Sequence, residues 1–218
     1  MRTLCYDFRM SEISWSSLYR CRKEVNARYP SVFRLPSVRR AVRLARPYVR
    51  SGTRILEIGP GENRRGARLA AEVSGAASFS VDPDPQGAHD YRDISEAGDG
   101  FDLVMAFEVI EHLPLNEALE LMRAVRIRLR SGGLFVLSTP NVFCPGAYLR
   151  DCTHRTPFAF DELGGALLFT GFEVVGLYRV VPGSILRRFK KAICSPLGRA
   201  LGVDHAVSIA AVARVRSP

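Results

Sequence analysis

Short apolar runs alternate with helical patterns along most of this chain, and this alternation limits the fold more than any other feature. The clearest run, "DLVMAF" at residues 102–107, is continuously apolar, as in strands that are buried on both faces of a parallel sheet. Asn116 then caps an amphipathic helix that directs Leu119 and Val125 inward. Strands that alternate with helices predict an α/β fold with a Rossmann-like, doubly wound, mainly parallel sheet.

The remaining strands and helices follow the same alternation. The expected strands are "RILEI" before Gly59 and residues 78–82, 134–140, 172–181 and 206–215; the expected helices cover residues 37–50, the region of Leu69 and Val73, and residues 160–171. The last two strands lack a long crossover, which predicts an antiparallel C-terminal strand at the edge of the sheet. Only ten residues separate Asp82 from Asp93, so we expect the third strand to be short or missing.

Composition places the chain among ordinary globular proteins. Of its 218 residues, 47% are hydrophobic and 24% charged, and no apolar run approaches the ~20 residues that span a membrane. The N-terminus lacks the apolar region of a secretory signal, and the five cysteines are scattered, which predicts a cytoplasmic protein. The net charge of +9 leaves nucleic acid, an anionic membrane and an acidic substrate open as partners.

Two segments stand outside the alternating core. Residues 1–36 are aromatic and basic, and we expect them to form a helical cap or lid on the main domain at 37–218. Residues 183–203 form a basic insertion, in which 183–194 separates apolar from cationic side chains on a helical wheel. That pattern suits a helix on an anionic membrane surface, peripheral to the inner membrane, and also a helix packed on its own domain. We favour the packed helix because one short helix binds membranes weakly.

The sequence "LEIGPGEN" places Gly59 and Gly61 between a predicted strand and a predicted helix. Glycines at this point let a cofactor approach the backbone, and the helix N-terminus offers free N–H donors. A tight turn without any ligand would explain the same glycines. Two acidic residues favour the cofactor: Glu57 lies inside the strand and suits a ligand amine, and Asp82 ends the next strand, where doubly wound folds bind ribose hydroxyls.

Five segments occur in the order typical of one enzyme class: "ILEIGPGE", "SVDPD", "FDLVMAFEVIEHL", "LRSGGLFVLSTPN" and "LLFTGFEVV". Over residues 38–180 the chain resembles class I S-adenosylmethionine-dependent methyltransferases. The resemblance implies S-adenosylmethionine as cofactor, with these contacts: Glu57, Gly59 and Gly61 around the methionine portion, Asp82 at the ribose, Asp93 and Ile94 at the adenine, and Phe107 at the pocket floor. The usual third glycine of the loop is Asn63 in this chain.

The segment "AFEVIEHLP" places Glu108, Glu111 and His112 directly after a buried strand. If a helix begins near Glu108, positions i, i+3 and i+4 share a face, and the three side chains converge at the ligand-binding edge of the sheet. Adjacent carboxylates repel unless a cation or a proton intervenes, so a divalent ion is one resolution. In the alternative, Glu108 caps the helix, Glu111 is solvated and His112 packs. His154, after the fifth strand, should cross the same edge.

Taken together, these four residues resemble the metal site of a subgroup of the methyltransferases. Glu-x-x-Glu-His with a later His occurs in plant-type small-RNA 3′-end methyltransferases, and ubiquinone-pathway O-methyltransferases carry a similar set. The resemblance implies Mg²⁺ held by Glu108, Glu111, His112 and His154 and chelated by two neighbouring substrate oxygens. Coordination would stabilise the forming alkoxide while a nearby histidine takes the proton; His154 is then either the fourth ligand or the base, with His112 as the other catalytic candidate.

The sequence leaves three classes of acceptor open. We expect a sugar or oligosaccharide hydroxyl, because the compact domain lacks a polymer-binding appendage and "STPN" followed by "DCTHRTPF" looks like methyltransferases of glycan assembly. A catechol or quinone-type metabolite comes second, and an RNA 3′-terminal ribose third. No RNA-binding module is recognisable, which argues against nucleic acid as partner. A homodimer and a non-catalytic, cofactor-binding scaffold stay open as well.

Overall fold

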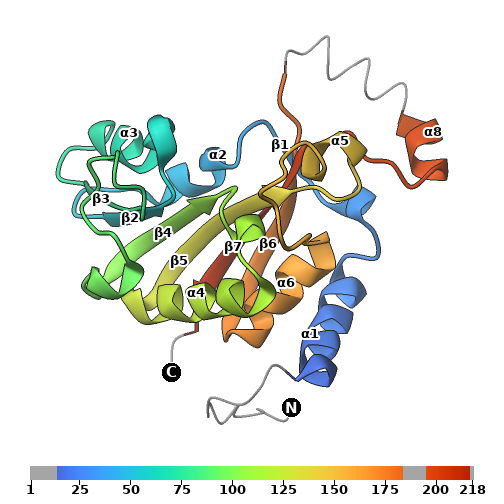
Figure 1. The fold of residues 1–218 in the computed structure, drawn as a ribbon, viewed down its shortest axis with the longest axis horizontal. Coiled ribbons are helices and arrows are strands. Elements are labelled where there is room, and N and C mark those ends of the chain that lie inside the picture. The colour runs from blue at the N-terminus through green and yellow to red at the C-terminus, as the bar shows by residue number, and fades with distance from the viewer. Residues whose placement is uncertain (1–13, 184–194, 217–218) are drawn as a thin grey trace.

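A seven-stranded mixed sheet forms the centre of the protein in the computed structural model, which describes residues 14–183 and 195–216 (Figure 1). The strand order is β1-β6-β7-β5-β4-β2-β3. The strands are β1 Ser37–Val38, β2 Arg54–Ile58, β3 Ala77–Val81, β4 Phe101–Phe107, β5 Leu129–Pro140, β6 Phe172–Val180 and β7 Ser208–Val215. All described pairings are parallel except those of β7, which confirms the Rossmann-like α/β class.

Helices cover both faces of this sheet. The α-helices are α1 Trp15–Arg28, α2 Val42–Ala45, α3 Arg65–Ala71, α4 Leu115–Arg128, α5 Pro145–Tyr148, α6 Phe160–Phe169 and α8 Ser195–Ala200. Short 3₁₀ turns are η1 Val32–Arg34, η2 Arg46–Tyr48, η3 Gly61–Asn63, η4 Ile94–Glu96 and η5 Ile110–His112. In the described part of the chain, no helix is long and apolar enough to cross a membrane.

The continuous apolar run of β4 is explained by burial on both faces. Val104 and Ala106 pack in the cluster that includes Leu119 of α4, on the face that α4 and α6 cover. Leu103 and Met105 alternate with them and pack in a second cluster with residues of α2 and α3. A strand buried on both sides has no polar face, and this is why the pattern at 102–107 could be recognised.

Three expectations about the sheet need correction or refinement. The C-terminal strand β7 is antiparallel, as expected, but it lies between β5 and β6 instead of at the edge. The third strand expected after Asp82 is reduced to one parallel bridge between Val81 and Tyr91, because too few residues remain for a full strand. β5 begins at Leu129, five residues before the expected start.

Two helix predictions were also wrong in part. The expected helix from Ser37 to Arg50 is replaced by the two-residue strand β1, the single turn α2 and the 3₁₀ turn η2. β1 forms because β6 offers an unpaired edge: the Arg179 N–H donates to the Pro36 carbonyl at 2.8 Å, and Pro47 then interrupts the helix. Helix α4 begins at Leu115 with Pro114 as its N-cap, so Asn116 lies inside the first turn.

Helix α1 packs on α6, which accounts for the described part of the predicted N-terminal cap. The buried Asp161 carboxylate on α6 accepts from Arg22 Nε at 2.8 Å and from Asn26 Nδ2 at 2.9 Å. A Cβ at Gly164 would lie 2.9 Å from a Val25 methyl, so the absence of a side chain there lets the helices approach closely. Residues 15–36 do not line the cavity described below, and a lid role stays a prediction. The proposed amphipathic helix at 183–194 lies outside the described residues beyond Gly183.

The Asp161→Ala variant is expected to lose about 2 kcal/mol of unfolding free energy, because it leaves the partly buried Arg22 Nε without its acceptor and removes the hydrogen bond from Asn26. Urea unfolding followed by circular dichroism would measure the loss. Glu173→Ala is the matched control, since Glu173 faces Arg214 at 3.9 Å with both side chains about half exposed, and it should change stability by less than about 0.5 kcal/mol. Equal effects of the two substitutions would contradict the docking role of Asp161.

Candidate active site

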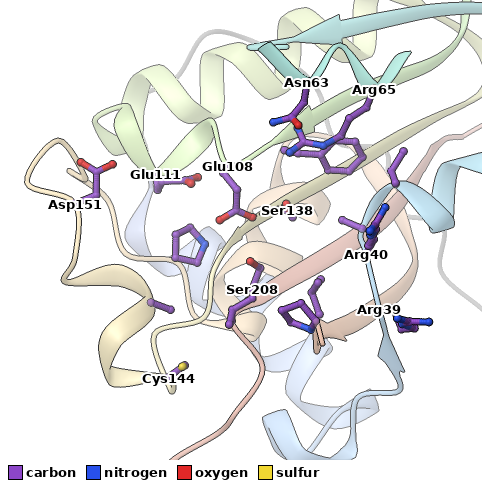
Figure 2. A pocket seen from close by; sticks show the side chains of 18 of the residues that line it. Arg39, Arg40, Asn63, Arg65, Glu108, Glu111, Ser138, Cys144, Asp151 and Ser208 are labelled. Atoms are coloured by element: carbon purple, nitrogen blue, oxygen red, sulfur yellow. Dashed lines mark hydrogen bonds between the residues drawn. The ribbon is translucent and has the colours of Figure 1, made fainter. Parts of the chain in front are cut away.

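A cavity of about 1150 Å³ opens at the carboxyl ends of β4 and β5, where ligands bind in open α/β sheets (Figure 2). Phe107 ends β4 and Pro140 ends β5, and both line the wall. Ser208, the first residue of the antiparallel β7, reaches the same edge. The cavity therefore lies where the central strands converge, which is the position expected for a substrate pocket.

The glycine loop after β2 has the backbone geometry that a close ligand requires. Gly59 and Gly61 have φ values of +60° and +50°, in the region that favours glycine. A Cβ at Gly59 would lie 2.7 Å from a Val109 methyl, whereas Gly61 faces open space. The Gly59 N–H donates to the Val81 carbonyl at 2.9 Å, which ties the loop to the end of β3.

Glu57 is buried at 2% exposure beneath this loop, and one of its oxygens is already used. Its Oε2 accepts from the Gly66 N–H at 2.7 Å, which anchors the start of α3. Its Oε1 has no hydrogen-bond partner among the described residues. Burial raises the pKa of Glu57, and the N–H groups of Gly66 and Arg65 offset part of that effect. Glu57 therefore supports the loop from below, and a role toward a ligand amine stays a prediction.

The predicted ribose and adenine residues lie at the same edge of the sheet. Asp82 directly follows β3, and its backbone N–H donates to the Tyr91 carbonyl at 3.2 Å. Asp93, which is exposed, lies two residues after Tyr91. Its carboxylate accepts from the Ser95 N–H at 2.8 Å, and the hydrogen bonds with Ser95 lower the pKa of Asp93. Ile94 packs against the core at the start of η4. The glycine loop, Asp82 and the segment of Asp93 and Ile94 thus follow one another along this edge, and of them only Asn63 of the loop lines the large cavity.

Phe107 ends β4 and lines the cavity, and its place at the floor of the cofactor pocket stays a prediction. Its side chain is 5% exposed and lines the cavity wall. The Arg65 guanidinium lies 5.4 Å from the ring centroid, in cation–π contact, and Figure 2 shows Arg65 beside Asn63 at one end of the cavity. Asn63, which replaces the third glycine, also contributes to the wall.

Three of the four predicted metal ligands come together at the other end. Glu111, His112 and His154 offer ligand atoms that all lie within 4.8 Å of one another. The His112 and His154 ring centroids are also 4.8 Å apart. The N–H groups of Arg155 and Thr156 donate to the Glu111 carbonyl at 2.7 and 3.0 Å, so the segment after α5 is attached directly to η5.

Glu111 has the least satisfied side chain in this group. It is 0% exposed, and neither carboxyl oxygen has a hydrogen-bond partner in the described part of the chain. Burial, followed by the nearby Glu108 charge, raises the pKa of Glu111 to about 8. The Thr139 hydroxyl lowers that pKa slightly but makes no hydrogen bond to either oxygen. A buried carboxyl without donors needs either a proton or a cation.

Both histidines are oriented by their Nδ1 atoms. His154 Nδ1 lies 2.7 Å from the Tyr148 carbonyl, which can only accept, so this nitrogen carries the proton. The Thr153 hydroxyl donates to Asp151 at 2.7 Å and therefore accepts from His112 Nδ1, at 2.9 Å. Neutral His112 and His154 thus each keep an unprotonated Nε2, the usual arrangement of metal-binding imidazoles.

The backbone at Glu108 differs from the predicted helix. No helix begins at Glu108: its φ is +59°, η5 spans Ile110–His112, and α4 starts only at Leu115. Its carboxylate accepts from Ser138 Oγ at 2.6 Å, and Figure 2 shows it between Ser138 and Ser208. Burial raises the pKa of Glu108, while hydrogen bonds from the two serines and the Arg65 charge offset part of that effect.

The positive φ of Glu108 marks backbone strain at the site, since a residue with a Cβ pays ~1–2 kcal/mol there. We expect the free energy of unfolding of Glu108→Gly to exceed that of Glu108→Ala by about 1 kcal/mol. Both variants should lose catalytic activity. The two variants remove the same carboxylate and differ only in backbone freedom. Thermal unfolding compares them, and an alanine variant that equals the glycine variant would show that no strain is stored there.

Sequence reasoning missed four side chains of the site. Asp151 and Thr153 orient His112, and "DCT" carries the Asx-turn pattern in which Asp151 accepts from the Thr153 N–H at 2.9 Å, a signal that could have been read. Ser138 and Ser208 hold Glu108, but they are ordinary strand residues that give no local signal.

The family of the chain follows from comparison with known proteins. A family model described as a methyltransferase domain matches residues 32–177, well over half of the chain. The chain belongs to the methyltransferase domain family. Its fold agrees: a S-adenosylmethionine-dependent methyltransferase from Archaeoglobus fulgidus superposes with a TM-score of 0.63 at 20% identity, covering 92% of this chain and 100% of that one. The match confirms that the chain is a methyltransferase, and the fold agrees with the class I fold recognised from the sequence.

Curated relatives of this methyltransferase include two named ubiquinone biosynthesis O-methyltransferase. The protein from Ruegeria sp. is 36% identical over 107 residues, 42% of each chain, and that from Ruegeria pomeroyi is 36% identical over 112 residues, 44% of each chain. The chain therefore spans less than half the length of these relatives. A putative sarcosine dimethylglycine methyltransferase from Galdieria sulphuraria shares the fold at a TM-score of 0.57 and 12% identity, covering 81% of this chain and 83% of that one. Because such distant neighbours differ in the acceptors they are named for, the fold alone does not assign one.

Proposed function

We propose that this methyltransferase transfers the methyl group of S-adenosylmethionine to one of two neighbouring oxygens of an acceptor, with a divalent cation, Mg²⁺, at the site. The observation that carries the proposal is the buried Glu111 carboxyl, whose two oxygens have no partner among the described residues, beside two histidines that each keep a free Nε2. This donor set suits a cation, and it differs from a solvated glutamate beside packed histidines, the alternative reading of the sequence.

The donor set fits a small divalent ion. Glu111, His112 and His154 supply one carboxylate and two imidazoles, and Glu108 adds a second carboxylate nearby. Mixed carboxylate and imidazole ligands also suit Mn²⁺ and Zn²⁺, so the choice of Mg²⁺ rests on the resemblance to the Glu-x-x-Glu-His…His enzymes. A bound cation would lower the pKa of an acceptor hydroxyl and so prepare it for attack on the sulfonium methyl.

Residues of the chain would bind the donor, align the acceptor and accept its proton. The glycine loop and Asp82 would hold the donor at the edge of β2 and β3, with Phe107 between donor and cavity. Glu108 is fixed by Ser138 beside the path from donor to acceptor, and its position suits alignment of the attacking oxygen. A histidine that is not ligated, His154 or His112, could take the hydroxyl proton through its free Nε2.

The relatives favour a catechol-type acceptor. Two proteins 36% identical to the chain are named for ubiquinone biosynthesis, and a catechol presents two adjacent oxygens on one ring. A sugar or oligosaccharide hydroxyl is the second candidate, and the polar cavity wall supports it: Asn63, Ser138 and Ser208 offer hydrogen-bonding groups, and Phe107 is the aromatic residue among those that line the wall. The RNA 3′ end gains no support beyond the net charge of +9.

A methyl-transfer assay with labelled donor tests these alternatives directly. Catechols, mono- and oligosaccharides and short RNAs are each assayed with Mg²⁺ and with EDTA. We expect transfer to a compound with adjacent hydroxyls, and its loss in EDTA. Isothermal titration with S-adenosylmethionine separates an enzyme from a non-catalytic scaffold, because a degenerate scaffold would not bind the donor. Equal turnover with and without EDTA would end the cation part of the proposal.

A further inference from the structure

Arginines contribute to several parts of the cavity wall, and two of them lie on the side opposite the acidic and histidine residues. Five arginines contribute to its wall: Arg39, Arg40, Arg65, Arg68 and Arg150. Figure 2 shows Arg39 and Arg40 on the side away from Glu111 and Asp151, with Ser138 and Ser208 between the two groups. The cavity therefore has one end rich in carboxylates and imidazoles, which Arg150 adjoins, and a different side where the Arg39 and Arg40 guanidinium groups lie.

The edge strand β1 places two of these arginines. Arg39 and Arg40 directly follow Ser37–Val38, which pairs in parallel with the end of β6. The Val181 N–H donates to the Val38 carbonyl at 2.8 Å, so the chain leaves β1 at the carboxyl edge of the sheet. This two-residue strand adds little to the core, and its clearest consequence is to bring Arg39 and Arg40 to the rim of the cavity.

These arginines have few partners within the protein. Arg40, Arg68 and Arg150 form no ion pair in the described part of the chain, and Arg39 reaches only the Gly183 carbonyl, at 3.5 Å. Glu72, a carboxylate that also lines the cavity, is paired with Arg46 at 2.9 Å. Cationic side chains gathered around a cavity without carboxylate partners create a positive potential that attracts an anion.

We propose that the acceptor carries an anionic oxygen group, a carboxylate or a phosphate, which Arg39 and Arg40 bind while its neighbouring hydroxyls face Glu111. The planar guanidinium matches the paired oxygens of either group and forms short, charge-assisted hydrogen bonds with them. The inference rests on the proposed function for the reacting end of the acceptor and adds the chemistry of its other end. It also gives the positive charge at this face a role in substrate binding.

Matched pairs of compounds test the anionic group. 3,4-Dihydroxybenzoate differs from catechol by one carboxylate, and glucose 6-phosphate differs from glucose by one phosphate. Isothermal titration in the presence of S-adenosylhomocysteine measures binding of all four, independent of turnover. We expect the charged member of at least one pair to bind the wild type about tenfold or more tightly than its neutral partner. The pair that shows the difference separates a carboxylate from a phosphate.

The double variant Arg39→Gln/Arg40→Gln should remove that preference, with binding of the neutral compound changed by less than about twofold. Arg43→Gln is the matched control, because Arg43 is an exposed residue of α2 that does not line the cavity. Equal binding of charged and neutral compounds by the wild type, or a preference that survives in the double variant, would overturn the inference. Weaker binding of S-adenosylmethionine by the double variant would instead assign these arginines to the carboxylate of the donor.

The two proposals can fail separately. If no compound with adjacent hydroxyls is methylated while the arginine-dependent preference persists in titration, the proposed reaction is wrong and the anion site stands. If catechol is methylated as well as 3,4-dihydroxybenzoate, by wild type and double variant alike, the reaction stands and the anion site is wrong.

Discussion

Glu111→Gln is expected to lower metal-stimulated methyl transfer by about a hundredfold or more while leaving the affinity for S-adenosylmethionine near that of the wild type. The amide keeps the size of the carboxyl but removes the charge that a cation needs. Glu111 lies away from Asn63 and Arg65, the residues of the cavity wall that directly follow the glycines, so the affinity for the donor should not change. Labelled-donor turnover and isothermal titration measure the two quantities on the same protein.

The matched control for that experiment is Glu117→Gln, the same substitution at an exposed position in the first turn of α4. It should leave turnover and donor affinity unchanged. Loss of donor affinity in Glu111→Gln would point to a disturbed fold, and circular dichroism would reveal it. Wild-type activity of Glu111→Gln, with or without EDTA, would remove Glu111 from the chemistry altogether.

The sheet was predictable because most of its strands are long and buried on both faces. Residues 102–107 carry a continuous apolar run, and residues 172–180 are mostly apolar apart from Glu173 and Arg179, so both strands could be recognised without knowledge of their neighbours. β1 could not be found this way, since two residues carry no period and the strand exists only because β6 offers a free edge. The error had a consequence for function, because it concealed that Arg39 and Arg40 stand at the carboxyl edge of the sheet.

The acidic segment after β4 was recognised for a reason that proved partly wrong. We expected Glu108, Glu111 and His112 to share a helical face, but the chain instead uses a left-handed Glu108 and a 3₁₀ turn. Glu111 and His112 still meet His154, because the backbone of residues 155–156 is bonded to the Glu111 carbonyl. Residue types identified the cluster, whereas its geometry depends on contacts between distant segments that a local pattern does not contain.

The metal-free protein is expected to lose stability as the pH rises from about 5 to about 9. The folded pKa of Glu111, about 8, lies above the ordinary value of 4.5, so the neutral carboxyl stabilises the fold fully below about pH 4.5. That contribution is lost as the pH rises through 8, and a shift of this size corresponds to at most about 5 kcal/mol. Urea unfolding at several pH values, in EDTA, would follow the decline.

Two comparisons assign the decline to Glu111. The Glu111→Gln variant should show a flatter profile, although Glu57 and Glu108, whose pKa values are also raised, keep some slope in the same direction. Mg²⁺ or Mn²⁺ should restore stability to the wild type at pH 8–9 and not to the variant, because a cation replaces the proton that the buried carboxyl has lost. Equal profiles for wild type and variant would show that Glu111 ionises freely in the folded protein, and the unsatisfied carboxyl that supports the cation site would then be solvated.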